Sequence, residues 1–130
     1  MGASTPYLGA YDRQMWDAMA QGKFRLQRCC SCKAMRYPTG PTCPSCLSME
    51  FTWDEVSGSG EILSWVVFHR TYFDDFPAPY NVVAVRLAEG PIVMTSLHGP
   101  EPEGTWIGRR VKVGVRDHAG RFQHFVELAE

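Results

Sequence analysis

The sequence predicts a mainly β protein in which an N-terminal helix is followed by a cysteine-rich ribbon and a five-stranded barrel. Apolar residues recur every three or four positions before residue 22, and two Cys-x-x-Cys pairs then lie between short alternating segments. Five longer alternating segments follow with no helical pattern between them. We therefore divide the chain into a helical segment at 1–22, a ribbon at 23–53 and a barrel domain at 54–130.

An amphipathic helix is expected over residues 7–21. Trp16 lies beside its apolar stripe and broadens it, and Gly22 is suited to end it because glycine readily adopts a left-handed backbone. Such a helix either covers the core of its own protein or lies as an anchor on a partner. The stripe consists of Leu8, Tyr11, Met15 and Met19.

Two short strands are expected on either side of the cysteines, at residues 24–28 and 49–56, where apolar and polar residues alternate. The stretch between them, RCCSCKAMRYPTGPTCPSC, holds all five cysteines of the chain. Four of these form two Cys-x-x-Cys pairs with ten residues between them. The paired residues are Cys29 with Cys32 and Cys43 with Cys46.

This cysteine spacing is typical of a structural zinc site. Each pair forms a tight turn whose two sulfurs point to one spot, and two such turns complete a tetrahedron around the metal. Four thiolates leave no open coordination position, so the metal is expected to stabilise the ribbon rather than to do chemistry. Iron in a rubredoxin-like centre uses the same ligands but is the less common occupant, and disulfides or free thiols are the alternative. Cys30 is a spare residue, a substitute for Cys29, or a nucleophile that lacks a base nearby in sequence.

Composition and charge are those of an ordinary soluble domain, with 45% hydrophobic and 21% charged residues and a net charge of −1. No apolar run approaches the roughly 20 residues that span a bilayer, and no signal peptide is evident, so we expect a cytoplasmic protein without a membrane partner. Residues 23–46 carry five basic and no acidic side chains, whereas the remainder is acidic. Metal-bound thiolates would offset much of this local positive charge.

Five strands are expected in the barrel domain, and their number and lengths favour an OB-fold over an SH3-like barrel. Turns at Glu89-Gly90 and at Gly120 join neighbouring strands. The longest irregular piece is TYFDDFPAPY, residues 71–80. The expected strands occupy residues 60–70, 80–90, 91–99, 109–117 and 121–129.

No catalytic motif is recognisable in the chain. His98, His118 and His124 are scattered at strand ends and turns, and the pair His69-Arg70 is the best-placed polar pair because it ends a barrel strand beside the long loop. An enzyme that uses His69 is therefore a hypothesis ranked below the two binding functions considered next.

The loop after this strand is too apolar to be left in water. It either folds over the end of the barrel or contacts another protein or an apolar ligand. A single-stranded nucleic-acid binder is the rival hypothesis, because OB-folds and zinc ribbons both occur in such proteins, but Asp74 and Asp75 in the loop would repel phosphates. The aromatic and proline residues of the loop are Tyr72, Phe73, Phe76, Pro77, Pro79 and Tyr80.

The order of helix, ribbon and barrel, together with the stretches that follow, resembles a known family. It is similar to the acyl-CoA-associated OB-fold proteins with a rubredoxin-like zinc ribbon, domain-of-unknown-function family thirty-five. The similarity covers the chain from about Gln21 to Val115. Two departures are Cys30-Ser31 in the first turn and Lys33, where the family often has a glycine that eases the turn. The matching stretches are LQRCCSCKAMRYPTGPTCPSC, WDEVSGSGEILSWVVFHR, FPAPYNVVAVRLAEGPIVMTSLHG and IGRRVKVGV.

The resemblance implies a non-catalytic accessory subunit of a thiolase-superfamily enzyme: a thiolase, an acyltransferase, or a steroid side-chain aldolase in lipid metabolism. The acyl-CoA chemistry would belong to the partner, and this chain would meet the acyl-CoA only through the complex. A thiolase-like dimer that carries two copies of this chain is the simplest symmetric arrangement. The resemblance carries the four paired cysteines over as metal ligands. It also makes the loop the expected partner or substrate-channel surface, formed by His69, Arg70, Tyr72, Phe73, Phe76, Pro79 and Tyr80 together with Trp16 of the helix.

Overall fold

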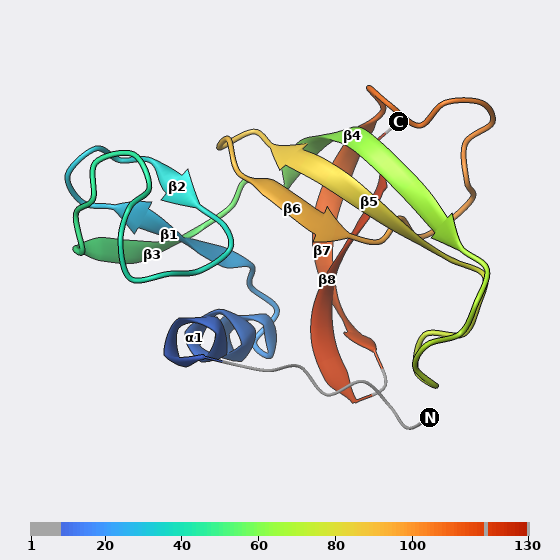
Figure 1. The fold of residues 1–130 in the computed structure, drawn as a ribbon, viewed down its shortest axis with the longest axis horizontal. Coiled ribbons are helices and arrows are strands. Elements are labelled where there is room, and N and C mark those ends of the chain that lie inside the picture. Colours follow the sequence, from blue (N-terminus) through green and yellow to red (C-terminus); the bar gives the residue numbers. More distant parts are fainter. Residues whose placement is uncertain (1–8, 119, 130) are drawn as a thin grey trace.

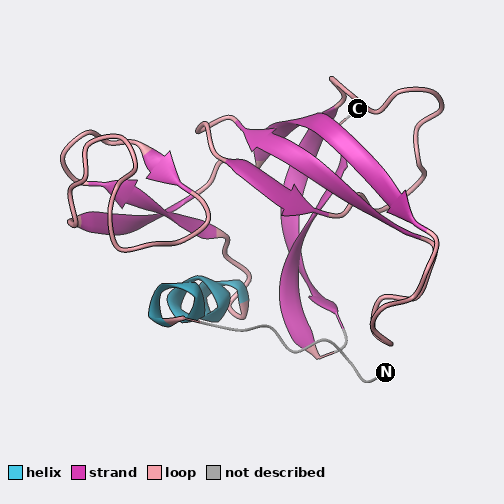
Figure 2. Ribbon diagram, viewed as in Figure 1, coloured by secondary structure: helices cyan, strands magenta, loops and turns pink. Residues whose placement is uncertain are grey.

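The computed structural model describes residues 9–118 and 120–129, which form one helix, a small three-stranded sheet and a five-stranded sheet (Figures 1 and 2). Among these residues, no helix has the length and apolar character needed to span a bilayer. The elements are α1 (Ala10–Met19), β1 (Arg25–Cys29), β2 (Met35–Arg36), β3 (Phe51–Glu55), β4 (Ser59–Phe68), β5 (Tyr80–Leu87), β6 (Ile92–Thr95), β7 (Arg110–His118) and β8 (Arg121–Leu128).

Helix α1 lies against both sheets and contacts β1 and β8 (Figure 1). Met15 and Met19 of the expected stripe are buried, and Gly22 follows the helix with φ of +82°, so the sequence predicted this end of the chain well. Leu8 of the same stripe lies outside the described residues. The Thr39 hydroxyl donates a hydrogen bond to Asp12, which ties the helix to the loop between the two cysteine pairs.

The ribbon is a three-stranded antiparallel sheet in the order β2-β1-β3. The two strands expected from the sequence are β1 and β3, whereas β2 is new and has only two residues, too few to show a period of two. The buried Gln27 donates from its side-chain amide to Gly40 O and accepts from Gly40 N, both at 2.9 Å. These two hydrogen bonds hold the loop that carries the chain from the first cysteine pair to the second.

The five-stranded sheet has the order β6-β5-β4-β7-β8 and curls until its two edges meet. The residues that follow β6 close the sheet onto β8 through a parallel bridge between Leu97 and Val126. Val126 N donates to Ser96 O and His98 N donates to Val126 O, each at 2.9 Å. The closing parallel pair and the order of the strands are those of an OB-fold, as the sequence predicts.

A β-bulge in β4 between Ile62 and Ser64 and the tightly packed Gly60 allow this curvature. A methyl group at Gly60 would lie 2.6 Å from Val85 Cγ1, so no larger residue fits where the strands cross.

One continuous apolar core joins the helix, the ribbon and the barrel. Trp65 and Trp106 stack within this core with ring centroids 5.3 Å apart. The partly buried Trp16 of α1 packs on His124 of β8 and on the core. The fully buried members include Met19, Leu26, Ile62, Val83, Val85 and Val126.

Candidate metal centre and candidate binding surface

The two cysteine pairs sit on turns with the same backbone pattern. In the first turn Lys33 N donates to Cys29 O at 3.0 Å, and in the second Leu47 N donates to Cys43 O at 2.8 Å. Lys33 and Leu47 occupy equivalent places and have φ of +69° and +67°. The glycine that the family often has at the place of Lys33 suits this backbone, because glycine adopts a left-handed conformation without strain.

These turns bring four sulfurs together. The Sγ atoms of Cys29 and Cys46 are 3.5 Å apart, as are those of Cys32 and Cys43, and all four lie within 4.8 Å of one another. A zinc tetrahedron with bonds of about 2.3 Å has edges of about 3.8 Å, whereas a disulfide needs about 2.05 Å. The cluster therefore fits a tetrahedral metal ion and not a pair of disulfides, and its four thiolates would fill the coordination sphere.

A backbone N–H lowers the pKa of the first cysteine in each turn. The N–H of Cys32 points at Cys29 Sγ over 3.5 Å and, ahead of the opposing effect of burial, lowers the pKa of that thiol to about 6. The Cys46 N–H lowers the pKa of Cys43 in the same way. Cys30 is exposed and lies outside the four-sulfur cluster.

The loop between β4 and β5 has an exposed part and a packed part. Tyr72 and Phe73 are 42% and 48% exposed, and the guanidinium of Arg70 lies 5.3 Å from the centre of the Tyr72 ring. Phe76 instead stacks on His118 at 4.5 Å, and Tyr80 stacks on Phe68 at 5.0 Å. Part of the loop therefore folds against the barrel, and the other part leaves aromatic rings exposed.

The remaining members of the expected surface differ in exposure. His69 and Pro79 are exposed, whereas Trp16 is half-buried. The Trp16 ring stacks on His124 with centroids 6.5 Å apart, so much of this side chain packs against its own core.

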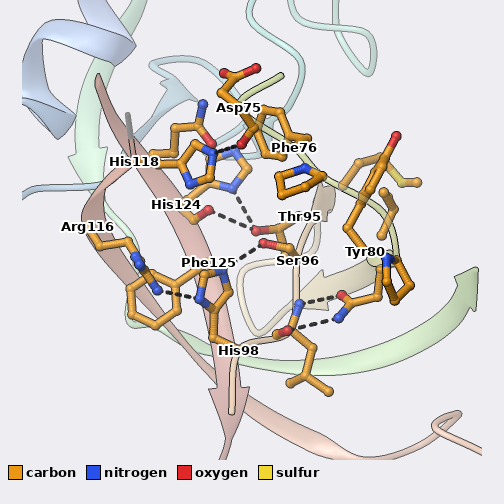
Figure 3. A pocket seen from close by; sticks show the side chains of 17 residues that line it. Asp75, Phe76, Tyr80, Thr95, Ser96, His98, Arg116, His118, His124 and Phe125 are labelled. Atoms are coloured by element: carbon orange, nitrogen blue, oxygen red, sulfur yellow. Dashed lines mark hydrogen bonds between the residues drawn. The ribbon is translucent and has the colours of Figure 1, made fainter. Parts of the chain in front are cut away.

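A pocket of about 440 Å³ opens behind the loop, between the residues that follow β6 and the hairpin of β7 and β8 (Figure 3). His98, His118 and His124 all line it, although the sequence left them scattered. Sequence reasoning missed this grouping because His98 lies on a different segment from the β7–β8 hairpin that carries His118 and His124, and only barrel closure brings the two together.

The three histidines have different partners. His118 Nε2 donates to the carbonyl oxygen of Asp75 at 2.6 Å, which holds the loop against the hairpin. His124 Nδ1 lies 2.9 Å from Thr95 Oγ1, and burial lowers the His124 pKa to about 4. Burial and, next, the neighbouring Arg116 lower the pKa of His98.

Ser96 and His98 form a serine–histidine pair, but its hydrogen-bond polarity is wrong for activating a nucleophile. Arg116 Nη1 donates to His98 Nδ1 at 2.5 Å, so this ring nitrogen carries no proton. Nε2 of the neutral ring must then carry it and donate to Ser96 Oγ at 3.1 Å. A general base would need the reverse arrangement, with an unprotonated nitrogen facing the hydroxyl.

Comparison with protein-family models gives two adjoining matches. Residues 16–52 match a family described as ChsH2, rubredoxin-like zinc ribbon domain, and residues 53–116 match ChsH2, C-terminal OB-fold domain. The first model covers the helix end and the cysteine cluster, and the second covers the barrel to near the end of β7.

Among curated proteins, the chain is similar to a probable enoyl-CoA hydratase alpha subunit of Thermomonospora curvata, with 38% identity over 77% of this chain and 32% of that protein. It is also similar to a DUF35 domain-containing scaffold protein of Pyrococcus furiosus, with 31% identity over 62% of this chain and 60% of that protein. The chain thus spans about a third of the hydratase subunit and somewhat under two thirds of the scaffold protein.

Among solved structures, the chain resembles a chain of the Ltp2-ChsH2(DUF35) aldolase. The TM-score is 0.87 at 30% identity, and the match covers 97% of this chain and 100% of that one.

Proposed function

The chain belongs to the ChsH2 family of DUF35 proteins, which join a rubredoxin-like zinc ribbon to an OB-fold, and on this premise we propose that it is an accessory subunit of a thiolase-superfamily enzyme acting on acyl-CoA thioesters. The observation that carries the proposal is the likeness of the whole chain to a chain of the Ltp2-ChsH2(DUF35) aldolase. A match over all of that chain includes the helix, ribbon and barrel together, so the same elements are available to contact a partner.

In this proposal the four paired cysteines bind one structural zinc ion, with iron as the less common alternative. Zinc would supply folding free energy to a ribbon whose longest strands have only five residues. The metal would do no chemistry, because four thiolates leave no position for substrate. Its role would be to hold the ribbon, and through Asp12 and Thr39 the helix, in one arrangement.

The exposed part of the β4–β5 loop would contact the enzyme. Tyr72 and Phe73 offer the large, rigid aromatic area that is enriched at interfaces, and Arg70 stacks over Tyr72 beside them. Phe76 and Tyr80 would support this surface from below, since their rings pack on His118 and Phe68. His69, Pro79 and the open part of Trp16 would extend it.

The acyl-CoA chemistry would belong to the partner. Ser96 and His98 are hydrogen-bonded with the wrong polarity for nucleophilic catalysis, and the four clustered cysteines are committed to the metal. We also propose the three-part division at residues 22/23 and 53/54 and a complex of one enzyme dimer with two copies of this chain.

Co-purification with a co-expressed thiolase-like protein tests the proposal. Tyr72→Ala and Phe73→Ala should weaken the complex at least tenfold each, since central aromatic anchors typically contribute about 2 kcal/mol or more. Ile107→Ala is the matched control, because Ile107 is 58% exposed on a different loop. Tight binding of oligonucleotides by a monomeric chain at moderate salt would contradict the proposal, and turnover of an acyl-CoA by the chain alone would contradict its non-catalytic part.

A further inference from the structure

A second hollow lies on the outer face of the barrel, where β4 runs between β5 and β7 (Figure 1). Its volume of about 410 Å³ falls in the range of roughly 300–1,000 Å³ found for small-molecule sites. It shares no lining residue with the pocket that the three histidines line. We call it the basic hollow, and its outward-facing residues are Ser59, Glu61, Arg86, Ala88, Arg110 and Lys112.

The strand register brings two arginines to either side of one glutamate. Leu87 on β5 and Val111 on β7 are buried in the core. Their neighbours Arg86 and Arg110 therefore point outward and are exposed. Both arginines pair across the strands with Glu61 of β4, so two guanidinium groups flank a single carboxylate.

Beside this row the sheet carries short side chains. Ser59 and Ala88 are both exposed, and Ala88 N donates to Ser59 O at 2.9 Å, so the two residues lie on adjoining chains. Lys112 of β7 pairs with Ser59 on the other side. The short residues leave space above the sheet, and the long charged side chains surround it.

The three cations of the basic hollow are not neutralised by direct ion pairs. Within the part of the chain that the structure describes, no carboxylate oxygen lies within 4.0 Å of the charged nitrogens of Arg86, Arg110 or Lys112. Glu61 leans towards the loop before β7, where its Oε2 lies 4.0 Å from the place that a Cβ would occupy at Gly108. The cations are therefore available to an anion from outside the chain.

The charges match a phosphate monoester. Three cations and one carboxylate give the described lining a net charge of +2, and a phosphate monoester carries roughly −1.5 to −2 at pH 7. Guanidinium groups suit phosphate because their N–H groups bind two of its oxygens at once. Glu127 pairs with Lys112 from β8 and lies outside the lining, so the two arginines are expected to contribute most.

Glu61 selects the rest of the ligand. An ionised carboxylate only accepts hydrogen bonds, so it repels a phosphate but binds the hydroxyl groups of a sugar. No aromatic side chain is among the described residues that line the hollow, so a nucleobase would find no ring to stack on. Donors on three sides and one acceptor between them fit a small phosphorylated polyol.

We propose that the basic hollow binds a small sugar phosphate, whose phosphate accepts hydrogen bonds from Arg86, Arg110 and Lys112 and whose hydroxyls donate to Glu61. The inference does not depend on the proposed function, because the lining includes no residue of the β4–β5 loop. A chain that captured no thiolase-like partner would still bind the sugar phosphate, so the two proposals fail separately.

Titration of the isotope-labelled full chain, followed by NMR at fixed ionic strength, tests the site with ribose 5-phosphate, inorganic phosphate and ribose. We expect ribose 5-phosphate to shift the amide signals of Glu61, Ala88 and Lys112 saturably. It should bind at least tenfold more tightly than inorganic phosphate, because its hydroxyls add hydrogen bonds to a charged group. Ribose should cause no saturable shift, because it lacks the phosphate.

Two variants separate the two halves of the ligand. Arg110→Ala should weaken ribose 5-phosphate binding roughly 10- to 100-fold, as expected for the loss of charge-assisted hydrogen bonds. Glu61→Ala should reduce the preference for ribose 5-phosphate over inorganic phosphate at least threefold, and this ratio is informative because the lost charge affects both phosphates alike.

Arg13→Ala is the matched control, since Arg13 is exposed on helix α1 and does not line the hollow. Arg110 is also exposed, so Arg110→Ala should unfold at the same temperature as the unaltered chain, which distinguishes lost binding from a lost fold. Arg86→Ala should show the same loss of binding and provides a second variant.

Three results would overturn the proposal. They are the absence of saturable shifts with ribose 5-phosphate, equal affinity for it in Arg110→Ala and the unaltered chain, and an unchanged preference in Glu61→Ala. Displacement of ribose 5-phosphate by an oligonucleotide of low micromolar affinity without terminal phosphates would assign the hollow to a nucleic-acid backbone instead.

Discussion

His124 makes the stability of this protein depend on pH in a way that can be worked out from its surroundings. Its ring lies between Phe24, with centroids 5.0 Å apart, and Trp16, at 6.5 Å. Thr95 Oγ1 donates to the carbonyl oxygen of His124 at 3.2 Å and lies 2.9 Å from Nδ1, so Nδ1 carries the proton of a neutral ring. Burial among apolar rings lowers the pKa to about 4.

The sign and size of the effect follow from linkage. Unfolding returns His124 to a pKa of about 6.5, so the unfolded chain binds the extra proton first, and stability is lost as pH falls from 6.5 towards 4. Each pH unit in this window is worth about 1.4 kcal/mol, so the loss between pH 7.5 and 5 is about 2 kcal/mol from this residue alone. Above pH 6.5 the contribution is complete.

Urea unfolding of the unaltered chain and His124→Phe across pH 5–7.5 measures this contribution. Phenylalanine keeps an aromatic ring between Phe24 and Trp16 but does not titrate. The difference in unfolding free energy between the two proteins should therefore change by about 2 kcal/mol over the range. Carboxylate titration and weaker metal binding in acid affect both proteins and cancel in the difference. Parallel pH profiles for His124→Phe and the unaltered chain would refute the reasoning.

Two further predictions concern the ribbon and the barrel. Cys43→Ser should abolish stoichiometric zinc in elemental analysis and unfold the ribbon. Cys30→Ser should keep the metal, because Cys30 lies outside the sulfur cluster. Equal zinc content in both variants would contradict the assignment of the ligands. Gly60→Ala should lower the free energy of unfolding in denaturant by about 1–3 kcal/mol, because its methyl group would lie 2.6 Å from Val85 Cγ1. Gly40→Ala is the control and should be near neutral, since nothing lies within 4 Å of the added methyl group. Equal losses in the two variants would contradict this account of the close packing.

The parts of the fold that were predictable from the sequence depend on local patterns. The helical stripe includes Met15 and Met19, and apolar and polar residues alternate in β5, β7 and β8. Each pattern lies within one segment and shows which of its faces is buried. The metal centre was equally accessible, because a Cys-x-x-Cys turn sets its own sulfur geometry within four residues. The strand β2 was missed because two residues carry no period.

The pocket could not be predicted in the same way. His118 and His124 share the β7–β8 hairpin, but His98 joins them only because the sheet closes between Leu97 and Val126, and the loop joins them because His118 holds it at Asp75. Both contacts join residues at least 29 positions apart, and nothing local to either residue specifies the other. The direction of the hydrogen bonds between Arg116, His98 and Ser96 is likewise a property of the assembled barrel.

The central claim is that this chain is a structural partner of a thiolase-like enzyme. Its most direct test is the mass of the species formed when both proteins are co-expressed, measured by light scattering during size-exclusion chromatography. We predict one complex that contains an enzyme dimer and two copies of this chain, with bound zinc. Elution of the two proteins as separate peaks, each with its full metal content and fold, would contradict the claim.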